Sequence, residues 1–393
     1  MKHIVERYDK ELFQMVGVTS GALAAIRRFL LRLIDQESAR IVVPPKKAAD
    51  GYWFGGGNMI EHDGDLYLIG RYRNAGDSRT GLAAGERGLE LALFKSADRG
   101  KSFEHVQSWT KDDLSSGGSE VLSIEGSCLV RRDEGFSLFV STEKRRPYPK
   151  GLEDFLKPGT GVWSIDEFLG LSPDSLDVRS IHPVLESEYP EYLHVKDPFW
   201  HEQSDGRGVL FFCTHPYGWS SHNTGYMVAN ESGFDEPVFD FFDRGPTWDV
   251  AMSRATDILP LPPVGELRGT TPLSVLFYDG GECLRRLDEH RAARTRPRGY
   301  SCEELGGAAL IPHDDYAAAE RISRIGPLFV SPHGTGSSRY VDVLVTREGY
   351  YATWQQSQPD CSQPLVMNHL SHAQAEALLS DEENAGVAGS ATG

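Results

Sequence analysis

The chain has few cysteines, no long apolar run and no excess of basic residues, and each shortage excludes a class of protein. Its five cysteines are an odd number with no Cys-x-x-Cys pair, which argues against a disulfide framework and a zinc ribbon. The N-terminus lacks the apolar stretch of a secretory signal. The most apolar early segment, residues 23–34, contains arginines and does not span a membrane. These features favour a reduced, cytoplasmic protein.

The charge is strongly acidic. Lysine and arginine total 40 against 57 aspartates and glutamates, for a net charge of −17. A surface this negative repels phosphate backbones and anionic lipid, so we expect neither nucleic acid nor a membrane as partner. A neutral, polyhydroxylated ligand such as a carbohydrate fits better.

The pattern along the chain changes twice. Residues 9–36 show apolar residues at three- and four-residue spacing, which predicts a helix that packs on the body of the fold or on a second subunit in a homo-oligomer. From about residue 40 the chain reads as short strands between turns, and the acidic, then Gly/Ala/Ser-rich end looks disordered. We therefore expect a helical extension over 1–38, one catalytic domain over 39–375 and a disordered tail over 376–393.

The strand pattern repeats. Residues 59–60 and 66–69 form a predicted hairpin around the tight turn Asp63-Gly64, and two further strands follow near 89–94 and 103–109. Four more units open in the same way further along the chain, and repeated four-stranded sheets are typical of propellers. The fifth unit lacks an outer strand, which residues 39–43 could supply. The sequence therefore predicts an all-β fold, a five-bladed β-propeller with an N-terminal helical extension.

Polar residues open the predicted blades at roughly equivalent places, and first strands of propeller blades line the central axis. Strands rarely contain aspartate, so a repeated acid suggests a shared site. Converging carboxylates shift one another's pKa, as the acid and base of glycoside hydrolysis require. The alternative is that these acids cap loops or hold a structural cation. The aligned residues are Asn58, Glu125, Asp197, Asp257 and Asp342.

Blade three carries a family resemblance. The segment Lys196-Asp197-Pro198-Phe199-Trp200 resembles the Asp-Pro opening of five-bladed glycosidases of families 43, 32, 62 and 130. That resemblance implies a glycosidase without a required cofactor, and a structural calcium ion held near the axis through a histidine, for which His215 is best placed. In family 43 the general base is an Asp that opens blade one. Here Asn58 stands in its place, so either another carboxylate is the base or the mechanism differs.

Blade one also resembles sialidases. Residues 96–103 resemble the Asp-box, a structural turn between outer strands, and Gly70–Asp77 resembles the loop that carries a substrate-binding Arg and an acid. By that resemblance Arg71 contacts substrate and Asp77 is a catalytic acid; the alternative is a pair that braces an exposed loop. The arginine that opens blade one in sialidases is absent, which argues against sialic acid cleavage, although Tyr300 is superficially similar to the sialidase nucleophile.

Aromatic and basic residues complete the predicted site. Trp200 and Trp354 lie near strand ends, where sugar rings could stack, and Arg254 and Arg339 could bind hydroxyls or a substrate carboxylate. The sequence predicts an exo-acting glycosidase, with inversion or retention left open. One alternative is a carbohydrate-binding propeller without activity. The other is a phosphorylase or lyase, but a phosphorylase needs a cationic cluster beside the acids, and none is clear outside the arginine-rich residues 285–298.

The predicted site residues fall into two groups. The predicted catalytic residues are Glu125, Asp197, Asp257, Asp342 and Asp77, and the predicted substrate-binding residues are Asn58, Arg71, Trp200, His215, Arg254, Arg339, Tyr300 and Trp354.

Overall fold

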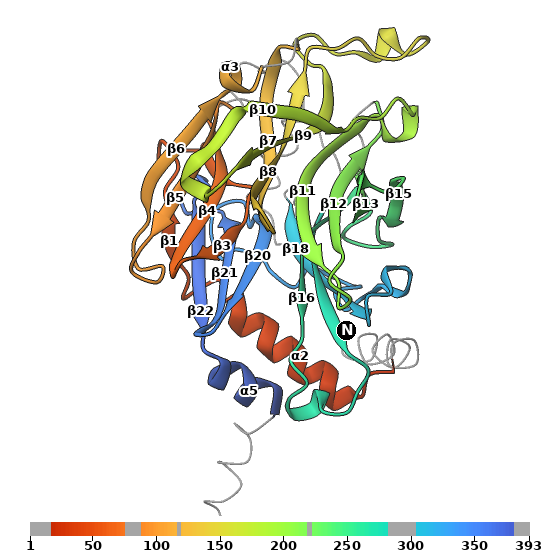
Figure 1. Cartoon of the computed structure of the whole chain (residues 1–393). Helices are drawn as coiled ribbons and strands as arrows, with labels where there is room; N and C mark the ends of the chain where they lie inside the picture. The colour runs from red at the N-terminus through yellow and green to blue at the C-terminus, as the bar shows by residue number, and fades with distance from the viewer. Residues whose placement is uncertain (1–16, 75–87, 116–118, 218–221, 282–303, 381–393) are drawn as a thin grey trace, which may run out of the picture.

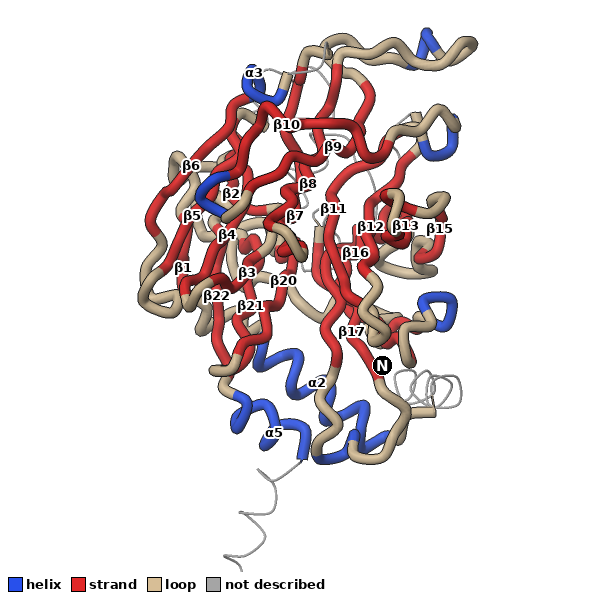
Figure 2. The backbone as a smooth tube through the Cα atoms, in the orientation of Figure 1, coloured by secondary structure: helices blue, strands red, loops and turns tan. Residues whose placement is uncertain are grey.

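The computed structural model describes residues 17–74, 88–115, 119–217, 222–281 and 304–380. Five antiparallel sheets are arranged around a central axis, and the helices labelled α2 and α5 lie together at one end of the molecule (Figures 1 and 2). The described chain is therefore an all-β, five-bladed β-propeller, as the strand pattern predicts.

Each blade begins at the axis and proceeds outward. Blade one consists of β2 (Trp53–Gly55) and β3 (Met59–His62) at the axis, then β4 (Asp65–Arg73), β5 (Glu90–Ser96) and β6 (Glu104–Thr110). Blade two consists of β7 (Val121–Arg132), β8 (Gly135–Lys144), β9 (Val162–Gly170) and β10 (Leu176–Leu185). Blade three consists of β11 (His194–Glu202), β12 (Gly208–His215) and β13 (Asn223–Asn230), with β14 (Gly233–Phe234) and β15 (Val238–Phe242) beside β13.

The last two blades follow the same order. Blade four consists of β16 (Met252–Pro260), β17 (Leu273–Gly281), β18 (Leu305–Pro312) and β19 (Glu320–Arg321). Blade five consists of β20 (Ser338–Thr346), β21 (Gly349–Gln356), β22 (Leu365–Leu370) and β1 (Arg40–Val43). The α-helices are α2 (Ser20–Leu33), α3 (Lys111–Leu114) and α5 (His372–Ser380).

The ring is closed by a strand from the start of the propeller. Strand β1 precedes blade one in sequence but pairs with β22 of blade five, with Ile41 opposite Val366. Closure of this kind joins the first and last parts of the fold and covers the edge that blade five would otherwise expose. The predicted role of residues 39–43 is confirmed.

Helix α2 packs on the propeller itself. The Thr19 hydroxyl accepts a hydrogen bond from the Ala22 amide at 3.1 Å and caps its N-terminus. Its apolar face is buried in a core that it shares with blades four and five, where Phe29 meets the Tyr350 ring at 5.5 Å. The predicted helix therefore contacts the body of the fold, and its apolar stripe is covered there. An oligomer formed through this helix remains a prediction.

Phe29→Ala is expected to lower the free energy of unfolding by about 3–5 kcal/mol, because it empties a fully buried site. Leu31 on the same helix is 50 % exposed, so Leu31→Ala is a matched control that should change stability little. Urea unfolding of both variants measures the difference. Equal losses would contradict the packing described for α2.

The ordered C-terminal part extends beyond residue 375. Helix α5 buries Ala375 and Leu379 in the same core as α2, so residues 376–380 belong to the packed fold and not to the expected tail. Residues 381–393 lie outside the described part of the chain. None of the described helices is long and apolar enough to cross a membrane.

Candidate active site

Irregularities at one level of the inner strands set the geometry of the axis. The pairing register shifts between Ile124 and Ser127 in β7, and at matching places in β11, β16 and β20. In blade one the inner strand is interrupted between β2 and β3. Side chains of a regular strand alternate between its two faces, so positions two apart face the same way. One extra residue at the register shift lets side chains three positions apart face the same way instead. Two levels of side chains therefore face the axis, about 10 Å apart along each strand.

The lower level links neighbouring blades. The Asn58 side chain accepts a hydrogen bond from the Leu129 amide at 2.8 Å and donates one to the Leu129 carbonyl at 2.9 Å. Asp257 Oδ2 accepts from the Val343 amide, and Asp342 Oδ2 from the Met59 amide, each at 2.9 Å. These three residues, here called the inter-blade ring, hold the backbone of the next blade. Asp257 and Asp342 were expected to join Glu125 and Asp197 in one catalytic carboxylate set, but their oxygens accept backbone N–H groups of the next blade instead. Asn58 was expected to bind substrate, and its side-chain amide is likewise engaged with the Leu129 backbone.

The two aspartates of the inter-blade ring have raised pKa values. Burial raises the pKa of Asp257, and burial together with the neighbouring Asp257 carboxylate raises the pKa of Asp342. Their folded-state pKa values lie above that of an unfolded aspartate. Ionising them therefore costs more in the folded state, and stability is lost as the pH rises through the folded pKa values.

Asp342→Asn is expected to reduce the loss of stability between pH 5 and pH 9 by about 1–3 kcal/mol, because each pKa unit corresponds to about 1.4 kcal/mol. The asparagine oxygen can still accept the Met59 hydrogen bond. Urea unfolding across this pH range measures the effect, with the exposed Asp205→Asn as control. Parallel pH profiles for wild type and Asp342→Asn would contradict the assignment.

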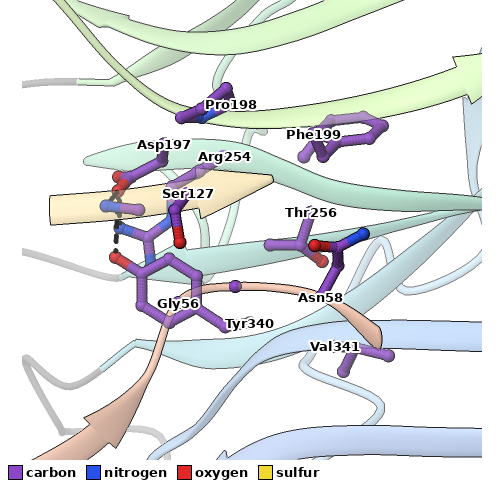
Figure 3. A pocket seen from close by; sticks show the side chains of 13 residues that line it. Gly56, Asn58, Ser127, Asp197, Pro198, Phe199, Arg254, Thr256, Tyr340 and Val341 are labelled. Atoms are coloured by element: carbon purple, nitrogen blue, oxygen red, sulfur yellow. Dashed lines mark hydrogen bonds and ion pairs between the residues drawn. The ribbon is translucent and has the colours of Figure 1, made fainter. Parts of the chain in front are cut away.

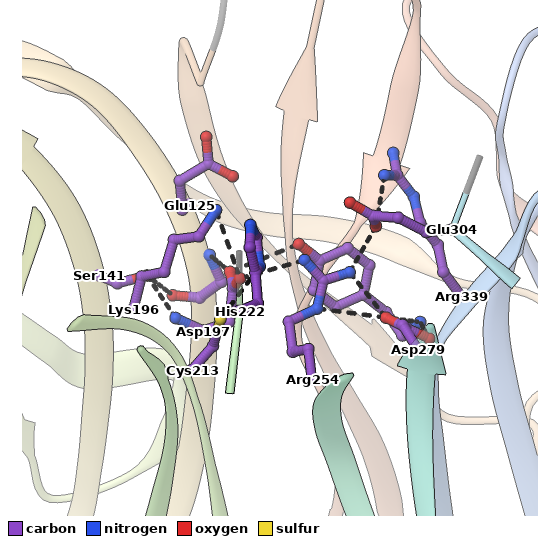
Figure 4. Close-up of polar contacts among 12 residues, drawn as sticks. Glu125, Ser141, Lys196, Asp197, Cys213, His222, Arg254, Asp279, Glu304 and Arg339 are labelled. Atoms are coloured by element: carbon purple, nitrogen blue, oxygen red, sulfur yellow. Dashed lines mark hydrogen bonds and ion pairs between the residues drawn. The ribbon is translucent and has the colours of Figure 1, made fainter. Parts of the chain in front are cut away.

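The upper level is a compact group of charges around Tyr340, here called the axial charge cluster (Figure 4). The chain connects β4 to β5, β12 to β13 and β17 to β18 at this same end of the propeller. The cluster consists of Arg71, Glu125, Lys196, Asp197, Arg254, Asp279, Glu304 and Arg339. Figure 4 labels all of these except Arg71.

Arg254 is the centre of the cluster. Its guanidinium, 1 % exposed, lies 2.7 Å from Asp279 Oδ2 and 3.3 Å from Asp197 Oδ2, and it also pairs with Glu304. Burial alone would raise the pKa of Glu304, but Arg254 and Arg339 together hold it well below its usual value. Burial outweighs Arg254 at Asp279 and raises the pKa of Asp279 to about 6. Asp279 is fully buried and cannot contact a ligand, whereas the Glu304 side chain is 21 % exposed.

Glu125 lies on the other side of the cluster (Figure 4). Arg71 Nη2 donates to its Oε2 at 2.7 Å. Burial alone would raise the pKa of Glu125, but Arg71 and Lys196 hold it well below its usual range. Glu125 and Glu304 are therefore two ionised carboxylates on opposite sides of the cluster.

Tyr340 separates the two levels of the axis. Its backbone has φ of +54°, a left-handed conformation, and its amide donates to both Asp279 oxygens at 3.1 Å. Its hydroxyl contacts Asp197 Oδ1 at 3.4 Å and Arg71 Nη2 at 3.3 Å, and the Arg254 guanidinium lies 4.0 Å from the ring centroid. These contacts fix the ring across the axis.

The axial cavity beside Tyr340 is too small for a sugar. It is bordered by the inner strands of blades two to five and by the residues between β2 and β3, including Asn58, Asp197 and Thr256 (Figure 3), and its volume is about 20 Å³. That volume accommodates roughly one water molecule. The cavity beside Tyr340 is therefore no binding site for a sugar ring.

Two predicted aromatic contacts lie elsewhere. Trp354 is fully buried in the core below α2, and its Nε1 donates to Gln36 Oε1 at 3.3 Å. Trp200 stacks on Phe139 at 6.1 Å in the core between blades two and three. Trp354 is a core residue, whereas Trp200 is partly buried and packs against the core. A strand-end position does not tell which face a side chain occupies, so it could not place either tryptophan. Neither side chain borders the axial cavity or belongs to the cluster.

The other predicted residues have mixed outcomes. Glu125, Asp197, Arg71, Arg254 and Arg339 are brought together in the cluster. His215 is 3 % exposed and lies beside the cluster in a row with His194 and His222, at ring distances of 4.8 and 4.7 Å. Burial lowers its pKa well below the usual value, so the ring is neutral. The predicted acid Asp77 and Tyr300 lie outside the described residues.

Sequence reasoning missed four members of the site. Lys196 and Tyr340 are adjacent to the predicted Asp197 and Arg339. Asp279 lies two residues before the end of β17 and Glu304 immediately precedes β18, on the two sides of residues 282–303. The sequence signal for these two acids is their position, one at each end of a long insertion between two strands. Because the two strands pair, the ends of the insertion are brought together.

The structural calcium ion expected near the axis stays a prediction for the described residues. No three of their His, Cys, Asp or Glu side chains gather closely enough to hold a metal ion. The inter-blade ring uses its oxygens to accept backbone N–H groups, and His215 has no carboxylate partner among the described residues. The calcium expected at the axis is therefore not assigned to these groups.

Comparison with solved structures identifies the fold. The protein BT0996, solved as an RGII complex, superposes with a TM-score of 0.57 at 10 % identity, covering 89 % of this chain and 95 % of its own length. An α-L-arabinofuranosidase from Lactobacillus brevis gives 0.52 at 11 % identity, covering 83 % and 92 %. A thermostable family-43 glycoside hydrolase gives 0.50 at 12 % identity, covering 83 % and 91 %. These identities are low, so the likeness shows the fold and confirms the predicted resemblance at that level.

No family model matches the chain, and no curated protein matches its sequence.

Proposed function

We propose that the chain is a glycoside hydrolase whose active site is the axial charge cluster. The observation that carries the proposal is the pair Glu125 and Glu304, two carboxylates held ionised on opposite sides of the cluster above Tyr340. Glycoside hydrolysis needs an ionised carboxylate as base or nucleophile, and a protonated acid at the leaving oxygen. Two of the solved propellers that share this fold are a family-43 glycoside hydrolase and an arabinofuranosidase, which supports the same class of reaction.

The proposed roles follow from charge and exposure. Glu125 or Glu304 serves as base or nucleophile, since both are ionised at neutral pH. Asp197 accepts from the Gly126 amide at 3.0 Å and pairs with Arg254, so it positions the cluster and stabilises developing positive charge. The general acid must come from a group outside this ionised set. Asp77, which follows the end of β4 at Arg73 in sequence, is the proposed acid.

Exo action is proposed because Tyr340 and the small cavity block the axis. A glycan cannot pass along it, so a glycan end binds above Tyr340 with its terminal sugar innermost.

A screen of aryl pyranosides and furanosides with wild type, Asp197→Asn and Glu304→Gln tests the function. Wild type should release the aryl group from at least one glycoside, and each variant should lower kcat/KM by about 10²–10³-fold. The exposed Asp205→Asn is the matched control. Activity that survives both cluster substitutions would refute the site. Sugar binding without turnover of any glycoside would favour a carbohydrate-binding propeller.

Phosphorolysis is a second candidate, because four cationic side chains gather in the cluster. Arg71, Lys196, Arg254 and Arg339 stand beside the acids, and a phosphorylase needs such a cationic group to hold phosphate. Phosphate-dependent release of a sugar 1-phosphate would favour this reaction. Turnover that is unchanged by phosphate would favour hydrolysis.

A further inference from the structure

Two buried donors on the blade-five side of the cluster have no acceptor among the described residues. Arg339, 5 % exposed, donates from Nη1 to Glu304 at 2.7 Å and from Nε to Gln355 Oε1 at 3.0 Å, while its Nη2 has no partner there. The Gln355 side chain is fully buried, and its Nε2 likewise has no partner in the described part of the chain. Buried N–H groups are rarely left unpaired, so this pair points to a ligand with acceptor oxygens.

The two donors belong to side chains that are hydrogen-bonded to each other, because Arg339 Nε donates to Gln355 Oε1 at 3.0 Å. In a planar guanidinium, the N–H groups of Nε and one Nη lie along one edge, the edge that binds a carboxylate in bidentate fashion. Gln355 Oε1 accepts from Nε on that edge. The Gln355 nitrogen Nε2 belongs to the same amide group and is therefore close to Arg339. One oxyanion with two oxygens can therefore accept from Arg339 and from Gln355 together.

The surroundings favour a negative ligand on this side. The Trp53 ring lies 4.1 Å from the Arg339 guanidinium and 4.4 Å from that of Arg73, so one indole holds two positive groups. Arg71 is the third arginine of blades one and five in this region. The carboxylates Glu125 and Asp197 come from blades two and three, so three arginines of this region lie on the side formed by blades one and five.

We infer that Arg339 and Gln355 form a subsite for the carboxylate of a uronic-acid sugar, which places the scissile bond toward Glu125. This inference rests on the proposed glycosidase function and names its substrate class. A singly charged carboxylate fits better than phosphate, because the cluster already balances its charges and Glu304 lies next to Arg339. The balanced groups are the cations Arg71, Lys196, Arg254 and Arg339 and the acids Glu125, Asp197, Asp279 and Glu304.

Equilibrium binding to the full chain tests the subsite without requiring turnover. Isothermal titration uses D-glucuronate and D-galacturonate, their neutral counterparts D-glucose and D-galactose, and inorganic phosphate. At least one uronate should bind tenfold or more tightly than its neutral counterpart. Arg339→Lys keeps a cation for Glu304 but loses the planar fork, and should weaken uronate binding at least tenfold. Arg179→Lys, at a side chain that is 88 % exposed, is the control and should change nothing.

A second variant keeps the subsite testable if the Arg339→Lys protein does not fold. Gln355→Glu keeps the shape and the acceptor oxygen but replaces the free donor with negative charge, so it should abolish uronate binding. Equal affinity for uronates and neutral sugars, or wild-type uronate affinity in both variants, would overturn the inference. Phosphate binding without uronate binding would also overturn it and would favour phosphorolysis.

The two proposals fail in different ways. Hydrolysis of neutral aryl glycosides but not of aryl uronides would refute the uronate subsite and would still support the glycosidase proposal. The opposite result would be uronate binding that depends on Arg339 without cleavage of any aryl glycoside or uronide. It would refute the glycosidase proposal and would still support the subsite.

Discussion

Glu125→Gln is expected to lower kcat by about a thousandfold, the range for loss of a catalytic base, while the protein remains folded. Glutamine keeps an acceptor for Arg71 but carries no charge. Because Arg71 and Lys196 hold the pKa of Glu125 well below its usual range, the wild-type carboxylate is ionised throughout neutral and mildly acidic pH. The fold-loss in kcat should therefore be similar at pH 5 and pH 8 on the best aryl substrate of the screen.

Two comparisons separate catalysis from packing at Glu125. Glu120→Gln changes the same residue type at an exposed side chain that pairs with Arg145, and should retain full activity. Glu125→Ala opens space for a small anion, so formate or azide should restore part of the turnover if this carboxylate reacts. Activity within a factor of three of wild type in Glu125→Gln, or no rescue of a folded Glu125→Ala, would argue that Glu125 only pairs with Arg71.

The architecture could be predicted because it depends on local patterns. The Asp63-Gly64 turn has φ values of 52° and 87°, as a tight hairpin turn requires, and it sets the register of β3 and β4. The strand at residues 40–43 could be placed because the fifth unit lacked an outer partner. Such signals are contained in a few consecutive residues, and each propeller blade repeats them.

The site could be predicted only in part, because one added residue per inner strand changes which side chains meet. Arg254 precedes Asp257 by three positions, and the register shift between them turns both toward the axis at different levels. An alignment by residue type placed Asp257 beside Asp197, although Asp257 holds the backbone of Val343 instead. Shared acidity is a weaker guide to alignment than shared backbone contacts, and those contacts are visible only in three dimensions.

Long-range pairing explains the remaining misses. Asp279 and Glu304 are separated by 25 positions in the sequence yet both contact Arg254, because β17 and β18 are antiparallel neighbours. Trp354 illustrates the opposite error, since its burial is decided by helix α2 packing from the far end of the chain. Neither fact has a local sequence signal.

Arg254→Met is expected to cost about 3–5 kcal/mol of unfolding free energy at pH 7, the range for removing one partner of a buried ion pair. The guanidinium is 1 % exposed and is shared by Asp197, Asp279 and Glu304. Methionine fills the space but leaves these carboxylates without their main counterion. The pKa of Asp279 is already raised to about 6 by burial, and losing Arg254 should raise it further.

The pH dependence makes the Arg254 prediction specific. Carboxyls with raised folded-state pKa values destabilise the fold once they ionise, so the deficit of Arg254→Met should be largest near pH 8 and smaller near pH 5. Urea unfolding at both pH values measures it. Arg145→Met, which removes an exposed arginine paired only at the surface, should cost no more than about 1 kcal/mol at either pH. A deficit for Arg254→Met that is equally small, or that does not change with pH, would mean that water rather than Arg254 neutralises these acids. The cluster would then be too open to hold Glu304 ionised in the way the proposed chemistry requires.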